Sequence, residues 1–254
     1  MLTRPQIQRL AQKYGIGVQA QERDYIQHIL LFLLYNRAQS LLFKGGTALR
    51  IAYGSGRYSE DLDFNGTIRV GKIKALWSAL LDDLMDFGIN AEIRNEWQSE
   101  AGYSFDTSYQ GPLFDGRDRT KGKIRIDISL RREAVDTTRE LVTSEYADVR
   151  PFVITVLTRE HIMAEKVRAL IMRGKPRDLY DIWILLHQGV HLDRSLVLQK
   201  LAFVEVDFSS PKLESALEHV KQDWKRDLQP LLAQYIPWSD VTSSVHLLLD
   251  KLVD

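Results

Sequence analysis

The chain has 254 residues, of which 44% are hydrophobic and 27% are charged, as in an ordinary soluble globular protein. Lysine plus arginine number 34, as do aspartate plus glutamate, so no overall charge attracts nucleic acids or membranes, and any such attraction must be local. The absence of cysteine excludes disulfides and thiolate zinc sites. The sequence has neither the apolar run of a signal peptide nor a stretch of membrane-spanning length, so we expect a cytoplasmic protein with no membrane partner.

Hydrophobic periodicity predicts helices over residues 3–13, 19–37 and 73–87. In the second of these, six apolar side chains at helical spacing are expected in the core: Tyr25, Ile26, Ile29, Leu30, Leu33 and Leu34. Strands are predicted near residues 40–43, 61–64, 91–94, 103–105, 123–130 and 152–156. Further helices are predicted from Thr158, around residues 177–186, and over 193–202, 211–227 and 240–252.

This order of elements predicts an α/β (α+β) fold. We expect a small mixed sheet flanked by helices in an N-terminal lobe of residues 1–155. A helical C-terminal lobe of residues 156–254 is expected after it.

Paired glycines, Gly45 and Gly46, come after the first predicted strand, and a helix-compatible segment starts at Thr47. A strand–turn–helix of this kind points backbone N–H groups and a helix N-terminus at an anion. A Gly-Gly pair alone is more often only a turn. The phosphate-binding interpretation therefore depends on the residues of the next predicted strand.

That strand carries two acids, Asp61 and Asp63, which alternate with Leu62 and Phe64. Period two places both carboxylates on one face and both apolar side chains towards the core. Neighbouring ionised carboxylates repel, so the arrangement is costly unless a cation binds between them. A solvated strand edge is the alternative. Together with the glycines, however, the pair predicts a site for a nucleoside triphosphate and its magnesium ions.

A third acid lies on the strand Ile124–Leu130, which alternates strictly. Its isoleucines face inward, while Arg125, Asp127 and Ser129 share the other face. Asp127 thus supplies the third carboxylate that a two-metal site needs. A solvated strand aspartate is the competing interpretation.

The motif Lys44-Gly45-Gly46-Thr47-Ala48-Leu49, followed by Arg57-x-Ser59-x-Asp61-Leu62-Asp63-Phe64, resembles the signature of the AbiEii/AbiGii-type toxin nucleotidyltransferases. These belong to the DNA polymerase β-like nucleotidyltransferase superfamily. The resemblance extends from about residue 20 to the C-terminus. It implies the toxin of a bacterial toxin–antitoxin or abortive-infection pair, with a separately encoded antitoxin and tRNA as the favoured acceptor.

Later segments also resemble this family, which has a lysine and an aspartate lining the nucleotide site. The matching residues here are Lys166 and Asp178. The pattern leaves open whether Asp178 or Asp181 faces the cleft. Ordinary charges on helix surfaces are the alternative for Glu165, Lys166 and Asp178.

We therefore expect a nucleotidyltransferase that moves a nucleoside monophosphate from an NTP to an RNA hydroxyl. Asp61, Asp63 and Asp127 would hold two Mg²⁺, with Mn²⁺ as a substitute. The NTP phosphates would be bound by Lys44, Gly45, Gly46, Thr47, Arg57, Ser59 and Lys166. The dense basic stretch of residues 117–125 is a candidate for contact with a nucleic-acid backbone.

Two other functions stay open. A metal-dependent nuclease also uses strand carboxylates, but restriction-type nucleases place a lysine two residues after the strand acid, where this chain has Ser129. A non-catalytic module that binds nucleotides or the antitoxin is the second. The complete acidic set argues against it.

Overall fold

The structure, a computed structural model, describes residues 1–66 and 68–253 of the chain. It divides into two compact units, Met1–Leu157 and Thr158–Asp254. The sequence pattern placed the division between residues 155 and 156. Each unit has its own secondary structure and its own buried core.

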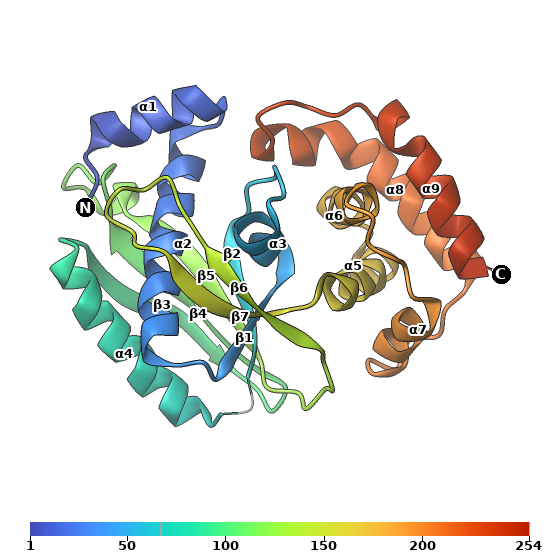
Figure 1. Cartoon of the computed structure of the whole chain (residues 1–254), viewed down its shortest axis with the longest axis horizontal. Helices are drawn as coiled ribbons and strands as arrows, with labels where there is room; N and C mark the ends of the chain where they lie inside the picture. Colours follow the sequence, from blue (N-terminus) through green and yellow to red (C-terminus); the bar gives the residue numbers. More distant parts are fainter. Residues whose placement is uncertain (67, 254) are drawn as a thin grey trace. The chain divides into compact units, whose positions relative to one another are not determined.

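The first unit holds one mixed sheet, whose seven strands within the described residues run in the order β3-β4-β5-β2-β1-β7-β6 (Figure 1). The central strand β2 pairs antiparallel with β1 and parallel with β5. The strands are β1 (Leu41–Lys44), β2 (Asp61–Gly66), β3 (Asn90–Gln98), β4 (Gly102–Gln110), β5 (Gly122–Ser129), β6 (Thr137–Val142) and β7 (Phe152–Leu157). The predicted α/β class with a mixed sheet is confirmed.

The first unit also contains four α-helices within the described residues, of which the second and the fourth pack against the sheet. They are α1 (Arg4–Tyr14), α2 (Val18–Arg37), α3 (Gly45–Tyr53) and α4 (Val70–Asp86), with a 3₁₀ turn, η1 (Asp118–Thr120). Figure 1 shows α2 crossing the sheet, with α4 beside it. The Trp77 indole of α4 donates a hydrogen bond to the Thr107 hydroxyl of β4 at 3.0 Å, and its ring meets Phe105 edge-on.

The alternation on β2 and β5 places apolar residues towards these helices. Leu62 and Phe64 are buried, as are Ile124, Ile126 and Ile128. Asp61, Asp63, Arg125 and Asp127 therefore share the opposite face. The six apolar residues predicted for the core side of α2 are all buried.

Two local predictions were wrong. Strand β6 was not predicted, because four of its six residues are polar and the fifth, Leu141, is exposed, so it shows no apolar alternation. The strand is defined by its antiparallel pairing with β7. Helix α4 begins at Val70, three residues before the predicted start at Ile73.

The second unit is helical. Its elements are α5 (Arg159–Arg173), α6 (Pro176–His187), α7 (Arg194–Ala202), α8 (Ser210–Leu228), η2 (Gln229–Leu231) and α9 (Trp238–Val253). Thr158 is the N-cap of α5, since its hydroxyl accepts a bond from the His161 N–H at 3.4 Å. Buried apolar residues of α6 and α8, among them Leu179, Ile182 and Trp224, form part of its core. In the described part of the chain, no helix is long and apolar enough to cross a membrane.

Candidate active site

The paired glycines join β1 directly to α3, because β1 ends at Lys44 and α3 begins at Gly45. Gly45 has a φ of +77°, a conformation that other residues rarely adopt. A Cβ atom at Gly45 would lie 2.2 Å from the Asp63 Oδ2 atom, and a side chain there would displace that carboxylate. Glycine thus lets the carboxylate of β2 lie against the start of α3.

Glycine is required at position 46 for a different reason, the closeness of two side chains. A Cβ atom there would lie 2.3 Å from Nη2 of Arg57 and 3.0 Å from the Ser59 hydroxyl. Arg57 is almost fully buried, at 2% exposure, and its Nη1 donates to the Tyr58 carbonyl at 3.1 Å. A buried guanidinium and a hydroxyl therefore lie against the N-terminus of α3, where an anion is favoured.

Six of the seven predicted nucleotide-binding residues thus belong to this glycine junction, whereas the seventh, Lys166, belongs to the second unit. Thr47 is fully buried, and its hydroxyl donates a hydrogen bond to the Asp61 carbonyl. That bond ties α3 to β2. Any contact with a bound phosphate is therefore expected from the Thr47 backbone N–H. Lys44 lies opposite Asp63 in the pairing of β1 with β2.

The three predicted carboxylates lie on the same sheet face in two adjacent rows. Asp63 of β2 is directly opposite Asp127 of β5, and Ser104 of β4 comes next in the same row. Asp61 is opposite Arg125, whose other neighbour across the sheet is Asp106. The parallel pairing of β2 and β5 therefore brings together acids that are 64 positions apart along the chain (residues 63 and 127).

A cleft of about 440 Å³ opens beside Asp61, and we call it the Asp61 cleft. Three acidic and three basic side chains among the described residues line it: Glu60, Asp61, Asp106, Arg23, Lys123 and Arg125. Arg23 and Glu60 form an ion pair at 2.8 Å. Mixed charges around an open cleft suit a substrate that carries both phosphates and hydrogen-bond donors.

Asp106 and Arg125 are site residues that the sequence did not single out as a pair. Burial alone would raise the pKa of Asp106. Hydrogen bonds from Asn95 and Arg125, with the charges of Lys123 and Arg125, instead hold this pKa below its usual value. Arg125 also lies 3.6 Å from Asp127. The guanidinium thus links a buried acid to the predicted third carboxylate, which is 47% exposed.

We call Asp61, Asp63 and Asp127 together the acidic row. Their carboxylates suit a hard divalent cation, because carboxylate oxygens are the ligands that Mg²⁺ prefers. Within residues 1–66 and 68–253, however, no three histidine, aspartate or glutamate side chains form a group that could hold a metal by themselves. Magnesium is commonly bound by one or two carboxylates together with substrate phosphates. Protein side chains alone therefore need not complete the site.

In the second unit, Lys166 and both candidate aspartates belong to one buried ion cluster. The Lys166 ammonium is 2.7 Å from Asp181 Oδ2 and 3.4 Å from Asp178 Oδ1. Arg173 donates two bonds to Asp178, each at 2.8 Å. Both aspartates are 0% exposed, and Lys166 and Glu165 are each 8% exposed. The alternative of ordinary surface charges is therefore wrong for Glu165, Lys166 and Asp178.

Comparison with known proteins identifies the family. A family model described as "Nucleotidyl transferase AbiEii toxin, Type IV TA system" matches residues 30–242, whereas no curated protein sequence matches the chain. JHP933 from Helicobacter pylori has a similar structure, with a TM-score of 0.61 and 19% identity over 93% of each chain. The MenT4 nucleotidyltransferase toxin from Mycobacterium tuberculosis H37Rv has a TM-score of 0.58 and 18% identity over 99% of each chain.

At such identities the two structures support the fold, whereas the family model covers most of the sequence. The predicted resemblance and the predicted enzyme class are confirmed. The chain belongs to the AbiEii nucleotidyl transferase toxin family of type IV toxin–antitoxin systems, and it is a nucleotidyltransferase.

Proposed function

We propose that this toxin transfers a nucleoside monophosphate from an NTP to a hydroxyl group of RNA, with tRNA as the acceptor. The observation that carries the proposal is the contact between the two halves of the motif. The Asp63 carboxylate lies against Gly45, and the Arg57 guanidinium lies against Gly46. Phosphate-binding groups and the acidic row are thereby adjacent in one unit.

In the proposed reaction, the acceptor oxygen attacks the α-phosphorus of the NTP. The bond from that phosphorus to the bridging oxygen breaks, and pyrophosphate leaves with the electron pair. The hydroxyl proton passes to a carboxylate oxygen, which we assign to Asp127 because this side chain is half exposed and lies beside Asp63.

Magnesium would be held by Asp61 and Asp63, completed by Asp127 and by the phosphates of the nucleotide. When bound, it would lower the pKa of the acceptor hydroxyl and stabilise charge on the leaving group. Manganese offers the same octahedral oxygen coordination. Carboxylates directly opposite one another are more stable with a cation between them than without.

The β- and γ-phosphates would be bound by backbone N–H groups of Gly45, Gly46 and Thr47, together with Ser59. Arg57 would balance their charge, since its planar guanidinium can bind two phosphate oxygens at once. Lys44 would contribute a further positive charge from the end of β1. We also propose that Lys166 and Asp178 take part in nucleotide transfer.

A separately encoded antitoxin and action in the cytoplasm are parts of the same proposal, and membership of a toxin–antitoxin family supports them. The nuclease alternative is weakened by the glycine junction, which phosphodiester hydrolysis does not require. The choice of tRNA rests on the relatives that the sequence resembles.

The test is incubation of the full chain with each of the four α-³²P-labelled NTPs, Mg²⁺ and total RNA. Label is expected in a discrete band of tRNA size. Asp63→Asn should reduce the transfer rate about 100-fold or more, because a lost metal ligand costs several kcal/mol of transition-state stabilisation. Asp86→Asn, at an exposed aspartate of α4, is the matched control.

Three results would contradict the proposal. Shortened RNA without incorporated label would support a nuclease. Full activity in folded Asp63→Asn would remove the acidic row from the reaction. Label in a band other than tRNA would keep nucleotidyl transfer and replace the acceptor.

A further inference from the structure

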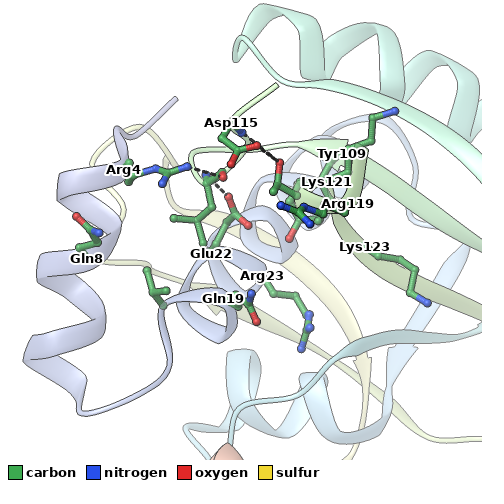
Figure 2. A pocket seen from close by; sticks show the side chains of 14 residues that line it. Arg4, Gln8, Gln19, Glu22, Arg23, Tyr109, Asp115, Arg119, Lys121 and Lys123 are labelled. Carbon is green, nitrogen blue, oxygen red and sulfur yellow. Dashed lines mark hydrogen bonds between the residues drawn. The ribbon is translucent and has the colours of Figure 1, made fainter. Parts of the chain in front are cut away.

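A second cavity, of about 470 Å³, lies in the first unit between α1, α2 and the segment that joins β4 to β5. Five of the described side chains that line it are cationic: Arg4, Arg23, Arg119, Lys121 and Lys123. Only two, Glu22 and Asp115, are acidic. We call it the basic cavity. Figure 2 shows that these charged groups come from opposite walls.

Two hydrogen bonds to the backbone of Leu113 hold the wall of the basic cavity in place. Glu22 Oε1 accepts the Leu113 N–H at 2.6 Å, and Arg4 Nη2 donates to the Leu113 carbonyl at 2.6 Å. These bonds fix the segment after β4 against α1 and α2 (Figure 2). A Cβ at Gly111 would lie 2.8 Å from Glu22, so glycine permits this approach.

The 3₁₀ turn η1 is ordered in a similar way. Asp115 accepts hydrogen bonds from Arg117 and from the Thr120 hydroxyl, the latter at 2.8 Å. At Gly122, a Cβ atom would lie 2.1 Å from the ring of Tyr109, which lines the cavity beneath the turn. Arg119 and Lys121 are therefore presented from a fixed turn.

Within the described part of the chain, Arg119 forms no ion pair. Arg4 is bonded to a neutral carbonyl, and Lys123 is 3.6 Å from Asp106, a long ion pair. Arg23 pairs with Glu60 at 2.8 Å, and Lys121 pairs with Glu92 and Asp118 at 2.9 Å each. The positive charge that the protein balances least is therefore that of Arg4 and Arg119. An external polyanion would supply the missing negative charge.

The basic cavity adjoins the Asp61 cleft, since Arg23 and Lys123 line both. An RNA strand whose terminal hydroxyl reaches the acidic row must pass its preceding phosphates along a neighbouring surface. This cavity provides positive charge at that position. It extends to Arg4 and Arg119, neither of which lines the Asp61 cleft.

We propose that the basic cavity binds backbone phosphates of the acceptor RNA, next to the hydroxyl that receives the nucleotide. This inference rests on the proposed function, because it places the acceptor relative to the same acidic row. A second NTP is a poorer occupant, because the glycine junction already supplies a phosphate site. An acidic protein segment would balance the positive charge of the basic cavity, but nothing in its chemistry requires it to extend into the Asp61 cleft.

The test uses the full chain and the double variant Arg4→Gln/Arg119→Gln. Fluorescence anisotropy would measure binding of a labelled 12-nucleotide single-stranded RNA, without NTP, from low to physiological salt. Two lost phosphate contacts should weaken binding about tenfold or more at low salt. They should also reduce the slope of log K against log[salt] by about 1.4. The KM for RNA should rise with little change in kcat.

Arg9→Gln/Arg132→Gln is the matched control. It removes two exposed arginines from the same unit, neither of which lines the basic cavity. A fluorescent ATP analogue would be titrated against every protein. Its Kd should be equal in all of them.

Unchanged RNA binding in the Arg4/Arg119 variant would overturn the inference, as would an absence of RNA binding by the wild type. Weaker ATP binding with unchanged RNA binding would assign the cavity to the nucleotide. Equal competition by polyglutamate would assign it to an acidic protein segment. If the Arg4/Arg119 variant bound RNA more weakly but the wild type incorporated no nucleotide, the result would support RNA binding by the basic cavity and contradict the proposed function.

Discussion

Gly46 is the residue at which one added methyl group tests the phosphate site most directly. Gly46→Ala must displace Arg57 and Ser59, because the new Cβ would lie 2.3 Å from the guanidinium. We expect NTP affinity to fall about tenfold or more, the equivalent of about 1.4 kcal/mol from a misplaced charge-assisted bond. Isothermal titration with each NTP in the presence of Mg²⁺ measures this loss.

Gly71→Ala is the control for Gly46→Ala. Gly71 lies exposed in α4 with no atom within 4 Å of an added Cβ. Alanine should stabilise the helix there by about 0.5–1 kcal/mol and leave NTP binding unchanged. If Gly46→Ala bound NTP like this control, the guanidinium at Gly46 would have no part in phosphate binding.

Glu22 gives a prediction on pH. Burial raises the pKa of this carboxyl group above its ordinary 4.5, although the Leu113 N–H and the charges of Arg4 and Arg23 oppose the shift. The folded state therefore binds a proton at Glu22 more tightly than the unfolded state does. Its stabilising contribution is present below pH 4.5 and is lost as the pH rises through the raised pKa.

Glu22→Gln removes this loss, so the Tm of the variant minus that of the wild type should increase as the pH rises from about 4 to about 7. Thermal unfolding followed by circular dichroism measures the difference. Glu214→Gln, at an exposed glutamate of α8, controls for the type of substitution. A difference that decreases over this pH range would mean that the charged form of Glu22 is the one favoured by folding.

At the scale of elements, period-two alternation made β2 and β5 predictable and placed Asp61, Asp63 and Asp127 on one sheet face. Strand β4 also alternates, with Tyr103, Phe105 and Tyr109 on one face and Ser104, Asp106 and Ser108 on the other. Asp106 was missed because the predicted strand covered only residues 103–105 and ended one residue before it. The site role of Asp106 arises from cross-strand pairing with Arg125, which a single sequence does not encode locally.

Helices α5 and α6 show a second limit of the sequence. Lys166 is spaced like a surface charge or a ligand-binding residue, yet it lies in a buried cluster with Asp178 and Asp181. Lys166→Ala should lower the free energy of unfolding by about 3–5 kcal/mol, since it leaves buried carboxylates undercompensated. Chemical denaturation measures this change. Arg168→Ala, on the same helix and only partly exposed, should change stability by about 0.5 kcal/mol or less.

Because that loss of stability would itself reduce activity, a second variant is needed to separate a structural role of Lys166 from a role in the reaction. Lys166→Met/Asp181→Leu replaces a buried ion pair with apolar groups, an exchange that is often neutral or stabilising. Recovery of both stability and single-turnover transfer would make Lys166 purely structural. Recovery of stability alone is the result expected from its proposed part in the reaction.

At the scale of the whole molecule, equal numbers of acids and bases conceal a local separation of charge. The basic cavity, the Asp61 cleft and the glycine junction all belong to Met1–Leu157. This unit also contains the complete sheet, since β7 ends at Leu157. Helices α5 to α9 have a separate core. The division therefore permits a test of which functions each unit supports.

A fragment of residues 1–157 is expected to fold by itself and to unfold in one cooperative thermal transition, because it keeps its sheet and the helices that cover it. It retains Gly45, Gly46, Arg57 and Asp63, so it should bind NTP with Mg²⁺. It lacks Lys166 and Asp178, so nucleotide transfer to RNA should be lost. Circular dichroism, NTP titration and the labelling assay measure the three properties.

A folded fragment that does not bind NTP would show that residues after Leu157 supply phosphate binding. One that transfers nucleotide at the rate of the full chain would remove Lys166 and Asp178 from the reaction.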